Sequence, residues 1–205
     1  MPQEGFLLVI DGPSAVGKST IFRMLLSQQQ VRFDLARRYT TRAKRAVDDD
    51  DDTYMFIAQG EFDRLVHDHA FIEHKCYKFG MCYGLPKSEV VDRLALGHHV
   101  IAMINLGNIV RVRSVIPNAF GVFVTASPET IRRRLEGRGT HPPEQIEERL
   151  GNARDSLRFL SLYDAVVSND DRRLDDVVGE ILRRFSEFLG GVSRSASRLS
   201  PGPDR

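Results

Sequence analysis

Residues 12–20 read GPSAVGKST and match the pattern G-x-x-x-x-G-K-[ST] at every fixed position. A short apolar run at 6–10 precedes them, and a segment of helical character at 21–26 follows. Glycines in such a turn let successive backbone N–H groups point at phosphate oxygens, with the positive end of the helix behind them. The chain is therefore expected to form a strand, a phosphate loop and a helix here, and to bind a nucleoside triphosphate.

The residue types within this loop predict separate tasks. Lys18 is expected to reach the outer phosphates, and the hydroxyl of Ser19 is expected to ligate Mg²⁺. The residues predicted to bind the triphosphate are Gly12, Ser14, Ala15, Val16, Gly17, Lys18, Ser19 and Thr20. The loop thus predicts a magnesium-bound nucleotide as one ligand.

Length and composition fit a soluble enzyme with one domain and insertions. Among 205 residues there are 29 lysines and arginines and 28 aspartates and glutamates, so overall charge does not favour nucleic-acid or membrane binding. The two cysteines, Cys76 and Cys82, are too few for a disulfide scaffold and are expected to be reduced. The N-terminal apolar run is too short for a signal peptide or membrane span, which predicts a cytoplasmic protein. No sequence pattern sets an oligomeric state.

Four short apolar segments are expected to be the strands of a core sheet: residues 6–11, 98–104, 119–125 and 163–168. Stretches of helical periodicity separate them, which is typical of a mostly parallel sheet with helices on both faces. The predicted fold class is therefore α/β, with a P-loop core.

Two helices have clear signals. Ser127 is expected to cap a helix that has Pro128 in its first turn and that ends at Gly137 and Gly139. The last helix shows apolar residues at spacings of three and four, namely Leu174, Val177, Val178, Ile181, Phe185 and Leu189. This helix is expected to close one face of the sheet.

The segment at about 37–94 fits the core pattern poorly, because it is rich in turns, aromatic residues and β-branched residues. It is interpreted as an inserted, mixed α/β substrate subdomain, with the core at 1–36 and 95–190. Residues 191–205 are polar and rich in glycine, serine and proline, which predicts a disordered tail.

A basic segment at 40–45 is a candidate clamp for a second phosphate. Arg42 and Arg45 stand three positions apart, with Tyr54 a little further along, and arginine forks match phosphate oxygens in pairs. The alternative is a solvated basic loop that is balanced by the acidic residues 48–52.

A further basic cluster comprises Arg134, Arg138 and Arg149, on a segment that contains Gly137 and Gly139. Such a segment could fold down over a bound triphosphate. Mobile arginines of this kind neutralise charge on a transferred phosphoryl group and exclude water.

In this order the features resemble the guanylate kinases, which move a phosphoryl group from ATP to GMP. The resemblance spans residues 9–188. Its pieces are the phosphate loop, TTRAKR at 40–45, Tyr54, FIEH at 71–74, YG at 83–84, RLEGRGT at 134–140, IEERL at 146–150 and YDAVVSND at 163–170. It implies a P-loop core with a nucleotide-monophosphate-binding insert and a lid, at about 136–150, and the ligands ATP, Mg²⁺ and small nucleotides.

The resemblance also implies roles on the acceptor side. The phosphate of the acceptor would be held by Arg42, Arg45, Tyr54 and Tyr83. Glu73 would recognise guanine, because an ionised carboxylate can accept from the two adjacent N–H donors of that base. Without the surrounding motif, Glu73 reads as a strand-end carboxylate that faces water.

On the donor side, the resemblance implies catalytic roles for Lys18, Arg134, Arg138 and Arg149. Asn169 would lie near the adenine of ATP. The alternative for Arg149 is a solvated position on a helix surface, although no carboxylate stands three or four positions away to pair with it.

Three positions depart from the family pattern and leave the acceptor open. Arg38 stands where the family usually has serine, and Leu85 follows Tyr83-Gly84 where serine or threonine is usual. Asn105 stands near the family's acidic D-x-D pair; it can form hydrogen bonds but carries no charge. Arg38 and Asn105 are nevertheless included in the predicted acceptor site.

Two alternatives remain. Bacterial ribose 1,5-bisphosphate phosphokinases resemble this chain in R-Y-x-T-R, here at 38–42, in an aliphatic residue after Tyr-Gly and in Asn105, which implies a sugar phosphate as acceptor. Guanylate kinase-like folds also serve as protein-interaction modules. The intact phosphate loop argues against that class, because Lys18 and Ser19 have no packing reason to stand together.

Overall fold

The computed structural model describes residues 5–44, 52–77, 80–137, 139 and 142–199. Two predicted site residues, Arg45 and Arg138, lie outside these ranges. The elements are β1 Leu7–Asp11, α1 Lys18–Leu26, β2 Phe33–Leu35, β3 Arg38–Thr40, β4 Tyr54–Phe56, α2 Gln59–His67, β5 Phe71–Cys76, β6 Cys82–Pro86, η2 Lys87–Glu89, α3 Val91–Ala95, β7 His99–Met103, α4 Ile109–Arg113, β8 Phe120–Thr125, α5 Pro128–Gly137, α6 Pro143–Ser156, η3 Leu157–Leu162, β9 Ala165–Ser168 and α7 Leu174–Leu199.

The core is a five-stranded sheet in the order β2-β7-β1-β8-β9, and every pairing in it is parallel. Strand β1 lies in the middle and is buried along its whole length, which explains why its sequence is apolar without alternation. The four strands predicted from apolar runs are β1, β7, β8 and β9. Strand β2 was missed because its three residues are too few to show a period.

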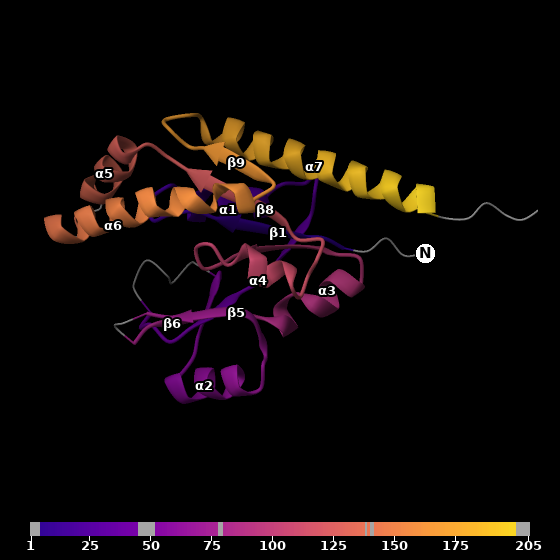
Figure 1. The fold of residues 1–205 in the computed structure, drawn as a ribbon, viewed down its shortest axis with the longest axis horizontal. Coiled ribbons are helices and arrows are strands. Elements are labelled where there is room, and N and C mark those ends of the chain that lie inside the picture. Colours follow the sequence, from indigo (N-terminus) through magenta and orange to yellow (C-terminus); the bar gives the residue numbers. More distant parts are fainter. Residues whose placement is uncertain (1–4, 45–51, 78–79, 138, 140–141, 200–205) are drawn as a thin grey trace, which may run out of the picture.

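Helices cover both faces of this sheet (Figure 1), which confirms the predicted α/β class. Helices α1, α5, α6 and α7 pack against one face through apolar residues such as Phe22, Leu135 and Phe185. Helices α3 and α4 pack against the other face through Leu94 and Val112. The predicted cap of α5 is present, since the backbone N–H of Thr130 donates to Ser127 Oγ at 3.2 Å.

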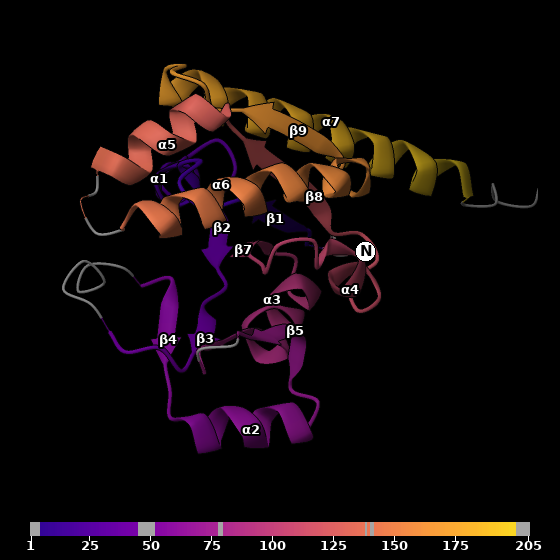
Figure 2. The ribbon, with the colours of Figure 1, turned by 60° about the vertical axis from the view of Figure 1, so that its left-hand side comes forward.

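The insert forms a second, four-stranded sheet in the order β4-β3-β6-β5. Its pairings are mixed, because β3 runs parallel to β4 whereas β6 is antiparallel to both β3 and β5. Helix α2 packs Phe62 against Phe71 of β5, and it lies at the end of the molecule away from α5 and α6 (Figure 2). The mixed α/β insert was predicted from its composition.

The prediction of a disordered tail from residue 191 is wrong for residues 191–199, because α7 continues to Leu199. The apolar spacing of the helix continues through Leu189 and Val192, which pack against the core. Gly190 and Gly191 each cost a helix only about 1 kcal/mol relative to alanine, so this packing outweighs them. Within the described residues, no helix combines the length and apolar character that a membrane span requires.

The prediction of reduced cysteines is also wrong, because Cys76 and Cys82 form a disulfide. The register of β5 and β6 places these residues directly opposite each other, with their Cα atoms 4.0 Å apart. Two cysteines six positions apart become neighbours only when the hairpin register is fixed, and composition does not reveal that register.

A buried carboxylate, that of Asp11, lies at the carboxyl edge of the core sheet. Asp11 is 1% exposed and accepts hydrogen bonds from the backbone N–H of Gly12 (2.6 Å), from that of Gly107 (3.0 Å) and from the hydroxyl of Tyr163. Burial raises the pKa of Asp11, and the hydrogen bonds from Tyr163 and Gly12 oppose that rise. Asp11 therefore joins the end of β1 to the segments that follow β7 and precede β9.

We predict that Tyr163→Phe lowers the free energy of unfolding by about 1–3 kcal/mol, because Asp11 loses a buried donor. The loss should be larger at pH 8 than at pH 4, which is close to the ordinary pKa of an aspartate. A carboxyl whose folded pKa is raised contributes stability at low pH and loses it as pH rises through that pKa; without the tyrosine hydroxyl, the pKa of Asp11 rises further. Urea unfolding at both pH values measures this. Tyr39→Phe is the matched control, and an equal loss at both pH values would contradict the account.

Candidate active site

The phosphate loop requires its two glycines. Gly12 has φ 139°, and a Cβ atom there would lie 2.1 Å from the carbonyl oxygen of Val124. Gly17 has φ 94° and precedes the first turn of α1. Any other residue at position 12 would collide with β8, which explains why the sequence pattern has glycine there.

Lys18 lies over the loop at the start of α1. Its Nζ donates to the carbonyl oxygens of Gly12 and Pro13, at 2.6 Å each. Phosphate oxygens can replace these neutral acceptors, and they would do so with a charge-assisted bond. Ser19 is exposed in the first turn of α1, where its hydroxyl suits the oxygen preference of Mg²⁺. The loop therefore fits a magnesium-bound phosphate chain.

Asn169 and Arg134 hold the loop from behind. Asn169 is 2% exposed, and its Nδ2 donates to the carbonyl of Val16 at 2.8 Å. The Arg134 guanidinium donates to the carbonyls of Asn169 (2.8 Å) and Ala15 (3.4 Å). Asn169 thus contacts the loop backbone at Val16, and Arg134 contacts the loop at Ala15 and the backbone of Asn169.

Arg149 reaches the loop from α6, where its Nη1 donates to the hydroxyl of Ser14 at 3.1 Å. The alternative of a purely solvated helix residue therefore does not describe Arg149. Of the three arginines predicted for the lid, Arg134 and Arg149 meet at the phosphate loop. Arg138 lies outside the described residues.

On the acceptor side, Glu73 is completely buried, so the alternative of a water-facing carboxylate is wrong. Its Oε2 accepts from Nδ2 of Asn108 at 2.7 Å and Nδ2 of Asn105 at 2.8 Å. Its Oε1 accepts from the backbone N–H of Asn105 at 3.3 Å and from Nη2 of Arg38 at 3.4 Å. One oxygen is thus held tightly and the other loosely.

Arg38 is 6% exposed and forms a buried ion pair with Glu73. Its guanidinium carbon lies 5.4 Å from the ring centre of Tyr83. Within the described residues, its buried Nε has no hydrogen-bond partner. The structure thus places Arg38 beside Glu73 and Tyr83, with one buried donor that no described group satisfies.

Three residues of the predicted phosphate clamp, Arg42, Tyr54 and Tyr83, lie near one another. The guanidinium carbon of Arg42 lies 5.1 Å from the ring centre of Tyr54 and 5.0 Å from that of Phe56. The rings of Tyr54 and Tyr83 are 6.1 Å apart at an edge-on angle. These aromatic contacts orient Arg42. Arg45 lies outside the described residues.

Sequence reasoning missed Asn108 as a member of this site. It stands three positions after Asn105, and both amides follow the carboxyl end of β7. Two amide side chains at that edge were an available signal. Tyr77 also joins the group, because its hydroxyl lies 3.5 Å from Oδ1 of Asn105 and burial raises the pKa of Tyr77.

The family model of guanylate kinase matches residues 5–187. The chain belongs to the guanylate kinase family. It is a nucleotide-binding P-loop kinase, which agrees with the geometry of the loop. A guanylate kinase from Anaplasma phagocytophilum has a similar structure, with TM-score 0.71 and 23% identity over 90% of this chain and 86% of that chain. A gluconokinase from Sinorhizobium meliloti 1021 shares the fold more distantly, with TM-score 0.54 and 15% identity over 94% and 98% of the two chains.

We predict that Asn169→Ala lowers the free energy of unfolding by about 1–3 kcal/mol, because the carbonyl of Val16 loses its buried donor. The variant should also bind ATP more weakly, since the loop loses a support. Denaturant unfolding and ATP titration measure the two effects. The control is Asn152→Ala on the exposed surface of α6, which should change neither. Equal behaviour of the two variants would show that Asn169 does not hold the loop.

Proposed function

We propose that this kinase transfers the γ-phosphoryl group of ATP to GMP and forms ADP and GDP. The supporting observation is the unequal environment of the Glu73 carboxylate. Its Oε2 is fixed by two short amide contacts, whereas the contacts of Oε1 to Arg38 and Asn105 are long. The N–H donors of guanine can replace the long contacts once Arg38 turns aside.

The acceptor phosphate would bind to Arg42 together with Tyr54 and Tyr83, whose side chains gather beside the base site. The guanidinium offers paired donors to phosphate oxygens, and the tyrosine hydroxyls add neutral donors. Arg45 remains part of this proposal as a further cation of the same segment.

In the reaction, an oxygen of the acceptor phosphate attacks the γ-phosphorus of ATP as the bond to the bridging oxygen breaks, and ADP leaves. Lys18, Arg134 and Arg149 would stabilise the charge on the transferred group, with Arg138 as a further proposed cation. When bound, Mg²⁺ supplies further neutralisation of the phosphate charge. Ser19 would hold it.

The proposed division of the chain follows from these roles. The core at 1–36 and 95–190 would bind ATP, and Asn169 would border the adenine. The insert at 37–94 would bind the acceptor, and a lid at about 136–150 would close to exclude water. We place the reaction in the cytoplasm, with small nucleotides as its substrates.

The Arg38–Glu73 ion pair favours a second candidate, phosphorylation of a sugar phosphate such as ribose 1,5-bisphosphate. In this case Glu73 would stay buried, as it is at 0% exposure, and the unpartnered Nε of Arg38 would face the acceptor. The two candidates differ in whether Glu73 touches the acceptor.

We predict that Glu73→Gln lowers kcat/KM for GMP about 10- to 100-fold, because the amide replaces an acceptor with a donor opposite guanine. Glu89→Gln is the matched control: Glu89 is also buried and pairs with Arg37 and Arg93, but it lies in η2 outside the acceptor site. The control should retain GMP turnover within about twofold.

The measurement is coupled ADP release with GMP, dGMP, AMP, UMP and ribose 1,5-bisphosphate as separate acceptors. A preference for GMP that survives Glu73→Gln would refute the guanine contact. Turnover of ribose 1,5-bisphosphate alone would establish the second candidate instead.

A further inference from the structure

A cavity of about 220 Å³ lies between the insert and α4. Ile72 and His74 of β5 line it, whereas Glu73, between them on the strand, does not. Side chains alternate along a strand, so over residues 72–74 the cavity lies on the face of β5 opposite Glu73. Phe71, where the register with β6 shifts, lines the cavity as well. The cavity shares strand β5 with the proposed acceptor site, and it borders α4, which begins directly after Asn108.

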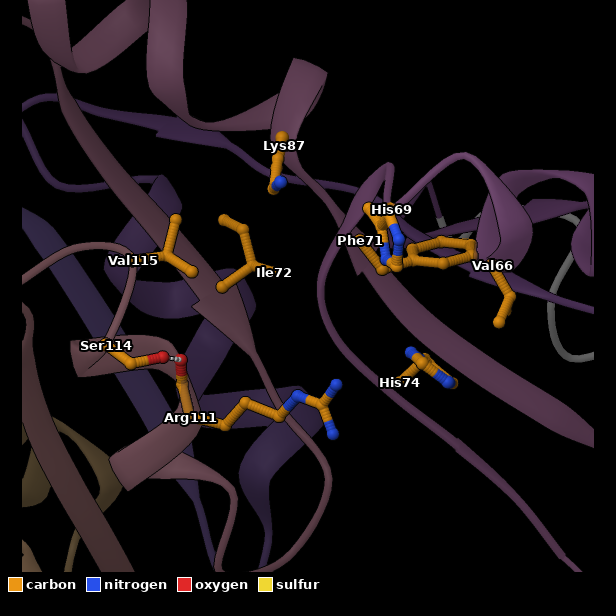
Figure 3. A pocket seen from close by; sticks show the side chains of 9 residues that line it. All are labelled: Val66, His69, Phe71, Ile72, His74, Lys87, Arg111, Ser114 and Val115. Carbon is orange, nitrogen blue, oxygen red and sulfur yellow. Dashed lines mark hydrogen bonds between the residues drawn. The ribbon is translucent and has the colours of Figure 1, made fainter.

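The polar lining of this cavity is basic. Figure 3 shows Arg111 extending from α4 toward His74, with Lys87 and His69 on the other walls. The remaining walls are largely apolar and include Phe71 and Val115. No carboxylate is among the described residues that line it. Two permanent cations and two imidazoles therefore face one space.

Neither Lys87 nor Arg111 pairs with a carboxylate in the described part of the chain. Neighbouring arginines differ in this respect. Arg93 pairs with Glu89 at 3.1 Å, and Arg113, two positions after Arg111 at the end of α4, pairs with Asp164 at 2.5 Å. The cavity is therefore lined by two cations that no carboxylate among the described residues neutralises.

The pKa of His74 responds to the positive charge in this cavity. Burial lowers the pKa of His74, the charge of Arg111 lowers it further, and Glu73, on the other side of the strand, raises it. An anion between Arg111 and His74 would offset the charge of Arg111 and so raise the pKa of His74. The other titratable groups that face the space are His69 and Lys87.

We propose that this cavity is a binding site for the phosphate group of a small anionic ligand, separate from the ATP and acceptor sites. A phosphate monoester carries a charge near −2 at neutral pH and offers oxygens to several donors at once, which matches Arg111, Lys87 and the imidazoles. The apolar walls would hold the organic part of such a ligand.

The position of the site gives binding a consequence. His74 follows Glu73 on β5, and Arg111 lies one turn beyond Asn108, whose amide holds Glu73. A phosphate that bridges His74 and Arg111 would therefore tie together the two elements that the Glu73–Asn108 contact already joins. Binding should stabilise the packing of the insert against the core.

The test is a titration of the full chain with inorganic phosphate, followed through the imidazole NMR signals of His69 and His74. Phosphate should raise the pKa of His74 by about one unit. The double variant Lys87→Gln/Arg111→Gln should weaken this response at least tenfold. Arg64→Gln on α2, which removes an exposed cation outside the cavity, should leave it unchanged. His98, paired with Asp34, is the distant reporter.

Thermal unfolding without phosphate establishes whether each variant is folded. If the double variant does not fold, the single variants Lys87→Gln and Arg111→Gln take its place, and each should weaken phosphate binding several-fold. Phosphate should also raise the unfolding temperature of the wild type more than that of the double variant. An unchanged His74 signal, an equal response in the double variant, or the same response to chloride at equal ionic strength would each overturn the proposal. None of these readouts depends on the identity of the acceptor.

Discussion

The buried carboxylate of Glu73 connects the insert to the core. Its partners come from β3 (Arg38), from the segment after β7 (Asn105) and from the residue before α4 (Asn108). Removing one partner of a buried charge costs about 3–5 kcal/mol, whereas a complete set of donors contributes little net stability. The network therefore acts mainly to position the insert, and the proposed acceptor site depends on that position.

A single short segment links this network to the phosphate loop. Between β7 and α4, Gly107 donates to Asp11, while Asn105 and Asn108 on either side of it donate to Glu73. Asp11 immediately precedes Gly12, the first residue of the loop. Two buried carboxylates, one beside each proposed substrate, thus share the same few residues. A shift of the insert would move this segment, and the movement would be passed through Asp11 to the phosphate loop.

Features encoded locally were predictable from the sequence. The phosphate loop, the buried strands and the Ser127 cap each follow from adjacent residues. Features that depend on strand register were not: the Cys76–Cys82 disulfide requires two strands to pair, and the burial of Glu73 requires Arg38, Asn105 and Asn108 to converge. The role of Asp11 was not predicted, because this residue ends an apolar run. The length of α7 was underestimated, because the glycine- and serine-rich composition after residue 189 suggested disorder and the packing of Val192 was not foreseen.

The most direct measurement is ³¹P NMR of the protein with magnesium, ATP and GMP. If Glu73 reads guanine and the phosphate loop presents ATP, the γ-phosphate signal of ATP should fall while the β-phosphate signals of ADP and GDP grow in equal amounts. Inorganic phosphate should not accumulate if the proposed lid closes over the substrates and excludes water. Absence of GDP under conditions in which ribose 1,5-bisphosphate consumes ATP, or conversion of ATP to ADP and inorganic phosphate alone, would contradict this account.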